Sequence, residues 1–347
     1  MSMLGWKLLA VIGVIVCAGL SFWIVDAVSQ SGGSDEEANS SRLSATRSVT
    51  RAETPVPTPV PTPVPTPVPD PVLIGAGDIT SCTQDNDALT AELIDAVVSS
   101  TAGEVVVFTA GDNVYEDGTL EEYEQCYDPT WGRHKARTRP APGNHDYGTA
   151  NADGYFAYFG AGAGDPALGY YGYDLGAWHI IVLNTSDHCR LIPCSQGSPQ
   201  EAWLRSDLVA HPTLCTLAIW HDPLFSSGSV HGNSDHVKPF WEALYQYGSD
   251  LVVNGHEHNY ERFAPQTPDG ALNPEYGLRQ FIVGTGGESH YQEGPFLDNS
   301  EAASGDTYGV MKLTLHAAGY GWEFISEEGG TFRDSGGGTC HGAPANP

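Results

Sequence analysis

Positive charge is scarce in this chain. Lysine and arginine together number 15, of which four are lysine, against 43 aspartates and glutamates, and the formal net charge is −28 at pH 7. A field of that sign repels phosphate backbones, so we set nucleic acid aside as a binding partner. An acidic surface also keeps exported proteins soluble, so only a small share of these carboxylates is needed for binding cations.

Cysteine is also infrequent, with seven in 347 residues. Cys17 lies within an N-terminal apolar segment. The other six are Cys82, Cys126, Cys189, Cys194, Cys215 and Cys340. An even number in an exported chain allows up to three disulfides. Cys189 and Cys194 are close enough in sequence to close one loop, whereas the sequence leaves the other pairings open.

The N-terminal apolar segment, residues 8–25, contains no charged residue and follows Lys7. Eighteen such residues can span a bilayer, while Val25 and Ala27 suit the −3 and −1 positions of a cleavage site. We therefore predict that residues 1–29 are a signal peptide or an uncleaved membrane anchor. In both cases the chain is extracellular or at the cell surface, and it meets a membrane only through this segment.

A linker is expected between this segment and the folded part. Residues 30–53 are rich in polar residues without apolar periodicity, which predicts disorder. Pro-Thr-Pro-Val repeats through residues 55–69 favour polyproline II, because alternate prolines exclude a helix or a paired strand. At ~3.1 Å per residue this gives a semi-rigid stalk of roughly 45 Å. Residues 30–70 thus form the linker, and residues 71–347 the folded domain.

Helices are expected between apolar strands. Residues 85–99 have apolar side chains at helical spacing, with Asp85 or Asn86 as the cap. This helix joins the first two strands into a βαβ unit with a parallel pair. A capping box at residues 198–201, with proline at the first helical position, opens a second helix. Residues 239–247 form a third.

The C-terminal part is expected to contain antiparallel strands within residues 278–325. A glycine-rich tail follows Phe332, and we expect only Cys340 to tie it down. Strands with crossover helices plus additional antiparallel strands indicate a layered sandwich of sheets with helices outside.

Potential metal ligands follow the apolar runs. His256 and His258 come directly after one predicted strand, and at i and i+2 they point to the same side of an extended backbone. Neutral imidazole nitrogens are good ligands for zinc or iron. Four earlier blocks place further candidates after apolar runs, and these are Asp78, Asp112, Tyr115, Asn144 and His221. We expect all of them to gather at one edge of a sheet.

In order, these blocks read D, GDxxY, GNHD, H and GHxH over residues 77–262. The series resembles the metallophosphoesterase superfamily, and within it the purple acid phosphatases. The superfamily more commonly begins with D-x-H. Here Thr80 replaces that histidine and Tyr115 appears instead, which is the purple acid phosphatase pattern. The resemblance extends over residues 72–325, and the flanking segments that share it are residues 200–204, 258–262 and 284–287.

This resemblance implies an α/β (α+β) fold, a four-layer α-β-β-α sandwich of two mixed sheets with a dimetal site at the C-terminal ends of the strands. The first metal would be held by Asp78, Asp112, Tyr115 and His258, with Asp112 bridging to the second. The second would be completed by Asn144, His221 and His256. The Tyr115 phenolate would favour ferric iron, with zinc, manganese or ferrous iron beside it.

The resemblance also suggests residues that act on the substrate. We expect His145 to serve as general acid, oriented by Asp146. His231 fits a position that contacts the substrate phosphate, although His236 is a rival and a solvated loop is an alternative for both.

Other charged residues are expected to have structural roles. Glu261 and Arg262 are expected to form a buried structural pair behind the site. Three arginines precede Gly143 and either line the pocket mouth or form a solvated basic loop: Arg133, Arg137 and Arg139.

The predicted function is that of an exported metal-dependent phosphoric ester hydrolase, acid phosphatase-like, which hydrolyses small phosphate monoesters by a metal-bound hydroxide. A phosphodiesterase or nucleotidase on the same site is the alternative within enzymes. A stalked surface protein with a non-catalytic metal site is the alternative outside them. The sequence leaves the natural substrate, the second metal and the oligomeric state open.

Overall fold

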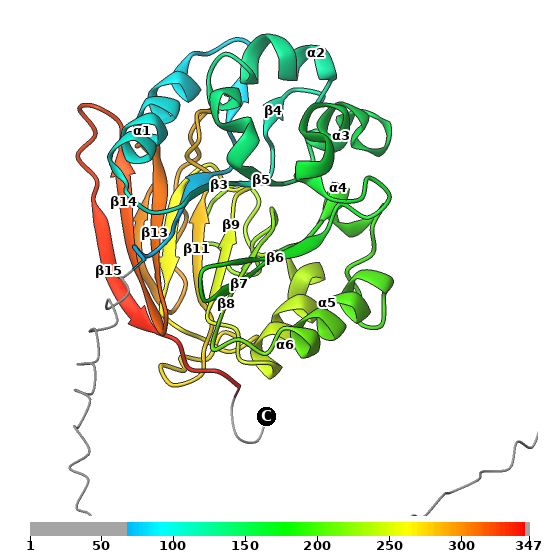
Figure 1. The fold of residues 1–347 in the computed structure, drawn as a ribbon, viewed down its shortest axis with the longest axis vertical. Coiled ribbons are helices and arrows are strands. Elements are labelled where there is room, and N and C mark those ends of the chain that lie inside the picture. The colour runs from blue at the N-terminus through cyan, green and yellow to red at the C-terminus, as the bar shows by residue number, and fades with distance from the viewer. Residues whose placement is uncertain (1–67, 344–347) are drawn as a thin grey trace, which may run out of the picture. The chain divides into compact units, whose positions relative to one another are not determined.

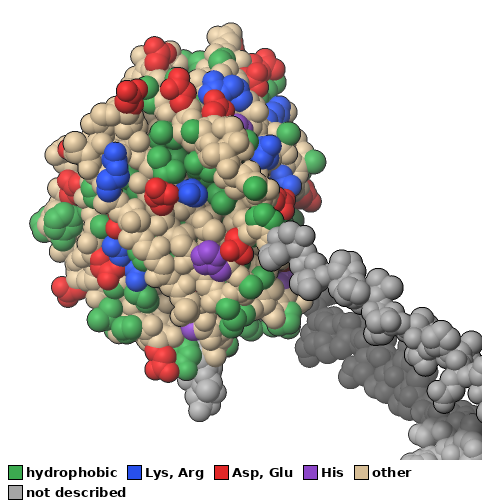
Figure 2. All heavy atoms as spheres, turned by 60° about the vertical axis from the view of Figure 1, so that its left-hand side comes forward, with side chains coloured by type: hydrophobic (Ala, Val, Ile, Leu, Met, Phe, Trp, Pro, Cys, Tyr) green, Lys and Arg blue, Asp and Glu red, His purple; other side chains and the backbone are tan. Residues whose placement is uncertain are grey.

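The computed structural model describes residues 68–343, so the predicted leader and nearly all of the predicted linker lie outside the described residues. Within residues 68–343, none of the helices combines the length and the apolar character needed to cross a bilayer. Carboxylates on the face shown in Figure 2 are scattered among basic, uncharged and apolar side chains. That pattern agrees with the prediction that most of the acidic residues make up a soluble surface and only a few bind cations.

A first sheet of six strands has the order β15-β14-β13-β1-β3-β5. Its strands are β1 (Val72–Ala76), β3 (Val105–Ala110), β5 (Thr138–Ala141), β13 (Gly309–His316), β14 (Gly319–Ser326) and β15 (Asp334–Thr339). β1, β3 and β5 are parallel, and β13 pairs antiparallel with β1. The expected βαβ unit is confirmed, because α1 (Asn86–Ser100) connects β1 to β3.

A second sheet of seven strands has the order β12-β10-β11-β9-β8-β7-β6. Its strands are β6 (Tyr171–Leu175), β7 (Trp178–Val182), β8 (Cys215–Ile219), β9 (Leu251–Asn254), β10 (Tyr260–Phe263), β11 (Arg279–Val283) and β12 (Ser300–Ser304). β7, β8, β9 and β11 are parallel, whereas β10 is antiparallel to β11. The antiparallel prediction for residues 278–325 is therefore right for β13 and β14 and wrong for one side of β11. A third, two-stranded parallel sheet joins β2 (Thr80–Ser81) to β4 (Val114–Tyr115).

The remaining elements are helical. The α-helices after α1 are α2 (Leu120–Glu122), α3 (Asp153–Phe159), α4 (Ser186–Cys189), α5 (Pro199–Ala210) and α6 (Lys238–Gln246). The other helical turns are η1 (Tyr123–Tyr127), η2 (Trp131–Arg137), η3 (Asp146–Gly148), η4 (Ala150–Ala152), η5 (Gly160–Ala163) and η6 (Asp235–Val237). Figure 1 shows α1 on one side of the layered sheets and α5 and α6 on the other.

Alternation along the strands explains the sandwich. On β8, Leu217 and Ile219 belong to the core between the sheets, while Ala218 belongs to a second core under α5 and α6. Successive side chains of a strand point to opposite faces, so a strand that is apolar throughout must be covered on both. The predicted mixed two-sheet α/β sandwich is confirmed.

α1 and α5 begin at the predicted positions, but the hydrogen bonds at their N-termini differ from those predicted. Asp85 is the N-cap of α1 but makes no side-chain cap bond. At α5, Ser198 accepts the backbone N–H of Glu201, and Pro199 occupies the first helical position. The reciprocal half of the expected capping box is wrong, because the Glu201 carboxylate accepts from Gly197 N–H and pairs with Arg205 instead.

Three disulfides join the six described cysteines: Cys82–Cys126, Cys189–Cys194 and Cys215–Cys340. The prediction of up to three bridges, with one closing the 189–194 loop, is confirmed. The glycine-rich tail was expected to be held only by Cys340, and this is wrong. Residues 334–339 form β15, which pairs along its full length with β14.

Candidate metal centre

The predicted ligands meet where strands of both large sheets end. Asp78, Asp112 and Asn144 follow β1, β3 and β5 of the first sheet, and Tyr115 lies on β4 between them. His221 follows β8 of the second sheet, whereas His256 and His258 follow β9. The expectation of a single sheet edge is therefore wrong. The sandwich brings the C-terminal strand ends of two sheets together, and each sheet supplies part of the cluster.

One group of atoms surrounds the phenolic oxygen of Tyr115. It lies 3.0 Å from Asp78 Oδ1, 3.2 Å from Asp112 Oδ2 and 3.2 Å from His258 Nε2. Thr80 does not share this group, because its hydroxyl donates to the Asp87 carboxylate at 3.0 Å. The position that carries histidine in the D-x-H pattern thus faces away, and Tyr115 fills the corresponding place.

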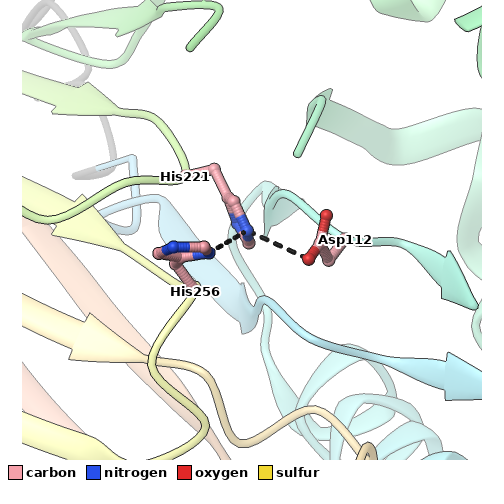
Figure 3. Close-up of side chains that lie close together, drawn as sticks. All are labelled: Asp112, His221 and His256. Atoms are coloured by element: carbon pink, nitrogen blue, oxygen red, sulfur yellow. Dashed lines mark hydrogen bonds and ion pairs between the residues drawn. The ribbon is translucent and has the colours of Figure 1, made fainter. Parts of the chain in front are cut away.

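A second group surrounds Nε2 of His221. This nitrogen lies 3.1 Å from each of Asp112 Oδ2, Asn144 Oδ1 and His256 Nδ1. Figure 3 shows the side chains of Asp112, His221 and His256 converging from different strand ends. Because Asp112 Oδ2 belongs to both groups, it is placed to bridge two cations.

Hydrogen bonds on the side facing away from the cluster fix the ring orientations of His221 and His258. His221 Nδ1 lies 2.8 Å from the carbonyl of Ala110, and His258 Nδ1 lies 2.6 Å from that of Ser289. A carbonyl can only accept, so Nδ1 carries a proton and Nε2 is the nitrogen that faces the cluster. Such outer contacts are typical of metal-ligating histidines.

Backbone conformation at the site is unusual for non-glycine residues. Asp78, Asp112 and His256 all have positive φ, at 58°, 46° and 73°. Left-handed residues of this kind cost energy and concentrate at functional sites. Close approach explains the glycines of two motifs: a Cβ on Gly143 would lie 2.2 Å from Asp112 Oδ1, and one on Gly255 would lie 2.5 Å from Asp78 Oδ2.

The buried groups shift one another's pKa. Burial and then the nearby Asp112 and Asp78 raise the pKa of Tyr115 well above its usual value. Burial alone would lower the pKa of His221, but Asp112 and its hydrogen bond raise it to about 10. Burial and the neighbouring His221 lower the pKa of His256 to about 3. Tyr115 therefore stays protonated unless a strongly charged cation compensates the phenolate.

The donor set fits two cations. A phenol and carboxylates are hard oxygen donors suited to ferric iron, while an amide oxygen with two imidazoles suits zinc, manganese or ferrous iron. Around His221 Nε2, an amide oxygen, a carboxylate oxygen and an imidazole nitrogen all face one point. A cation between them satisfies all of these atoms at once.

His145 lies at the rim of the cluster. Its backbone N–H donates to Asp112 Oδ1 at 2.8 Å, its Nδ1 lies 2.7 Å from the Glu116 carbonyl, and its ring packs on Tyr115 with centroids 4.2 Å apart. The expected orientation of His145 by Asp146 is wrong, since the His145 ring is held by Glu116 instead.

Asp146 has a different set of partners. Its fully buried carboxylate accepts from Gly143 N–H at 2.8 Å, from the Asn113 side chain at 2.9 Å and from the Tyr123 hydroxyl. Burial and the charge of Asp112 raise the pKa of Asp146 to about 6. This carboxylate holds the loop that carries Asn144 and His145.

His231 and His236 take different places. The ring of His231 stacks on that of His256 with centroids 4.0 Å apart, and its backbone N–H donates to Glu257. His236 lies beside Asp222 instead, with Nε2 at 3.7 Å from Oδ2. His231 is thus the candidate that borders the metal cluster.

The other charged predictions are partly corrected. Arg262 does not pair with Glu261, because adjacent strand residues point to opposite faces. Arg262 binds Asp334 at 2.7 Å, while Glu261 accepts from Ser227 N–H at 2.8 Å. Two of the three arginines ahead of Gly143, Arg133 and Arg139, line a separate cleft whose walls include none of the seven predicted ligands.

Sequence reasoning missed three residues at the site. Tyr291 stacks on His258 with centroids 3.9 Å apart. Asp222 is fully buried, with Oδ1 3.5 Å from His256 Nε2, and His188 bonds to it at 2.9 Å. Asp222 was available from its place directly after His221, but His188, in the short helix α4, and Tyr291, in a loop, belong to segments that carry no motif.

Comparison with known proteins finds similarity over the region that contains the predicted metal ligands. The calcineurin-like phosphoesterase profile matches residues 77–260. Purple acid phosphatase 15 of Arabidopsis thaliana is 31% identical over 130 residues, covering 36% of this chain and 23% of the relative. Purple acid phosphatase 1 of Ipomoea batatas is 29% identical over 209 residues, covering 54% of this chain and 41% of the relative. The chain thus spans less than half the length of these curated relatives.

Among solved structures, a purple acid phosphatase from yellow lupin (Lupinus luteus) seeds superposes with a TM-score of 0.64 at 20% identity. The match covers 80% of this chain and 55% of the lupin chain. At that identity the superposition establishes a shared fold.

Proposed function

The chain belongs to the calcineurin-like phosphoesterase family, and from that premise we propose that it hydrolyses phosphate monoesters at a dimetal centre of the purple acid phosphatase type. One observation carries the proposal: Tyr115 Oη lies within 3.2 Å of Asp78, Asp112 and His258. A phenol among these groups is the feature that separates purple acid phosphatases from the D-x-H pattern of the wider superfamily.

In this proposal Asp78, Asp112, Tyr115 and His258 would hold the first metal, for which the phenolate favours ferric iron. Asn144, His221 and His256, together with Asp112, would hold the second, and this set of donors suits zinc, manganese or ferrous iron. When bound, such a pair lowers the pKa of a coordinated water and aligns the attacking and leaving oxygens of a phosphate ester.

The protein's own residues position and protonate the substrate. The bond from His145 Nδ1 to the Glu116 carbonyl leaves Nε2 free to give a proton to the leaving oxygen. Asp146 acts on the same step at a distance, because it anchors the 143–146 loop through Gly143. We propose that His231, whose ring stacks on that of His256, contacts a phosphate oxygen.

Export is part of the proposal. Residues 71–347 would form the catalytic domain, carried on the 30–70 linker behind the 1–29 signal or anchor. Three disulfides within the described residues support an oxidising compartment, because such bridges persist outside the cytosol.

The test is the ratio of hydrolysis rates on a phosphate monoester and its matched diester, measured with the full chain after metal loading. Faster turnover of p-nitrophenyl phosphate than of bis(p-nitrophenyl) phosphate supports the proposal. Faster turnover of the diester moves the function to a phosphodiesterase on the same residues. Turnover of neither by a metal-replete chain contradicts hydrolysis altogether and favours a surface protein with a non-catalytic metal site.

A further inference from the structure

A second cluster of histidine and carboxylate side chains lies beside the predicted metal centre. His188 belongs to α4, Asp222 follows β8, and His236 belongs to η6. One ligand atom from each lies within 4.8 Å of the others. His188 Nδ1 is 2.9 Å from Asp222 Oδ1, and His236 Nε2 is 3.7 Å from Asp222 Oδ2. Three segments that are separate in sequence thus present two imidazoles to the two oxygens of one carboxylate.

We propose that His188, Asp222 and His236 bind a third divalent transition-metal ion, with zinc the best match. Bond lengths of about 2.0–2.2 Å place neighbouring ligand atoms of a tetrahedral zinc ion about 3.3 Å apart, and the two observed separations lie on either side of that value. Two imidazoles and a carboxylate are a common zinc ligand set, and three protein ligands leave a fourth coordination position open.

His236 supplies an independent argument. Its Nε2 is shielded from solvent and has no hydrogen-bond partner among residues 68–343. Its distance of 3.7 Å from Asp222 Oδ2 is too long for a hydrogen bond. A buried polar atom without a partner is costly, and an ion between the two side chains removes that cost.

The neighbouring structure holds the ligands in place. His188 and the residues on either side of it, Asp187 and Cys189, all have positive φ, and the Cys189–Cys194 disulfide closes the loop directly after His188. Asp222 is fully buried, and its backbone carbonyl accepts the indole N–H of Trp220 at 2.7 Å. The carboxylate therefore cannot turn out to solvent when an ion is lost.

The third ion would be linked to the predicted dimetal centre through a single side chain. Asp222 Oδ1 lies 3.5 Å from His256 Nε2, and His256 Nδ1 faces His221 on the other side of the ring. The open coordination position of the third ion would give a further contact to an anionic group bound at the dimetal centre. The metal-binding claim itself does not depend on the proposed hydrolysis.

Another cluster elsewhere in the fold also consists of two histidines and one aspartate, and it provides a control. In His179, Asp207 and His211, both nitrogens of His179 already bond to carboxylates, at 2.8 Å to Asp174 and 2.7 Å to Asp207. No nitrogen of His179 is left for an ion, so this cluster should bind none.

The experiment measures zinc per chain. The full chain is stripped with a chelator, reloaded with excess Zn²⁺, freed of unbound metal and assayed by mass spectrometry. We expect the double variant H188A/H236A to hold one zinc fewer than the wild type, and His211→Ala to hold as many as the wild type. A double variant that retains the full wild-type count overturns the proposal, as does loss of an ion from His211→Ala alone.

Misfolding is monitored by near-UV circular dichroism. If the double variant loses the wild-type spectrum, His236→Gln, which preserves side-chain size, replaces it with the same two outcomes. Because the readout is metal content, an absent third ion leaves the hydrolysis proposal standing, and an inactive enzyme leaves the third site standing.

Discussion

The phenolic oxygen of Tyr115 lies 3.0 Å from Oδ1 of Asp78, although 37 positions separate the two residues. The short parallel pairing of β2 with β4 creates this contact, because it aligns Ser81 with Tyr115 just beyond the loop that carries Asp78. β2, which carries Thr80 in place of the histidine ligand, is thus the strand that pairs with the strand carrying Tyr115.

Tyr115→Phe should remove colour from the iron-loaded chain. The phenolate is the group able to give a tyrosinate-to-iron absorption, and phenylalanine keeps the ring but not the oxygen. The measurement is the visible spectrum of wild type and variant at equal iron content. Tyr291→Phe is the matched control, because Tyr291 stacks on His258 and should leave the band unchanged. A band that persists in Tyr115→Phe would show that Tyr115 is not the ligand.

His145→Ala should distinguish substrates by their leaving groups. A general acid contributes about 10²–10⁴-fold when the leaving oxygen needs a proton, so turnover of an alkyl phosphate should fall by that order. Turnover of p-nitrophenyl phosphate should fall much less, because nitrophenolate leaves without protonation. His231→Ala should instead slow both substrates alike, since we propose that His231 contacts the phosphate. Equal losses on both substrates for His145→Ala would assign His145 a positioning role.

Asp334→Ala should destabilise the fold without altering the metal site. Asp334 accepts from Arg262, from the Tyr260 hydroxyl and from the Trp322 indole, with both ends of the ion pair largely buried. Leaving Arg262 without this partner should cost roughly 2–4 kcal/mol of unfolding free energy. Urea denaturation gives the value. Lys312→Ala breaks an exposed pair with Glu323 and should cost less than about 1 kcal/mol. Equal losses of unfolding free energy in the two variants would contradict a stabilising role of the buried Asp334 contacts.

Sequence patterns located the metal cluster because its residues follow strands. Asp78, Asp112 and His221 each come directly after an apolar run, and the ends of parallel strands meet at one edge. That argument is local, and it succeeds wherever the chain's own alternation fixes the direction of a side chain. It could not show that two sheets share the cluster, because packing of one sheet on another depends on contacts far apart in sequence.

The failures have the same origin. β15 contains Gly336, Gly337 and Gly338, which carry no strand propensity, and it forms because β14 offers a pairing edge and Asp334 binds Arg262. His188 reaches Asp222 through a loop closed by a disulfide. In each case a contact distant in sequence decides the structure, and no local pattern encodes it.

Asp250 should make stability depend on pH. Burial raises the pKa of Asp250 to about 6, although Thr216 N–H and His341 N–H donate to it. The folded state therefore holds this proton more tightly than the unfolded state. The resulting stabilisation is complete below the unfolded pKa near 4 and is lost as pH rises through about 6.

Asp250→Asn removes that titration. The unfolding free energy of the variant minus that of the wild type should increase by roughly 2–3 kcal/mol between pH 4 and pH 7. Any constant effect of the amide on the Thr216 and His341 bonds cancels in this comparison. Denaturant unfolding at several pH values gives the difference, and a difference that is flat across the range would reject the buried, raised-pKa carboxyl.

The most direct test of the dimetal account is Asn144→Ala in the full chain, with monoester turnover and metal content measured on the same sample. Asn144 Oδ1 lies 3.1 Å from His221 Nε2 and in the proposed centre contacts only the second cation, so its loss should remove that cation while β5 and its loop remain folded. The account predicts one metal fewer per chain than the wild type, with an unchanged near-UV spectrum and turnover reduced to background. Wild-type turnover from a chain that has lost this metal would contradict the account.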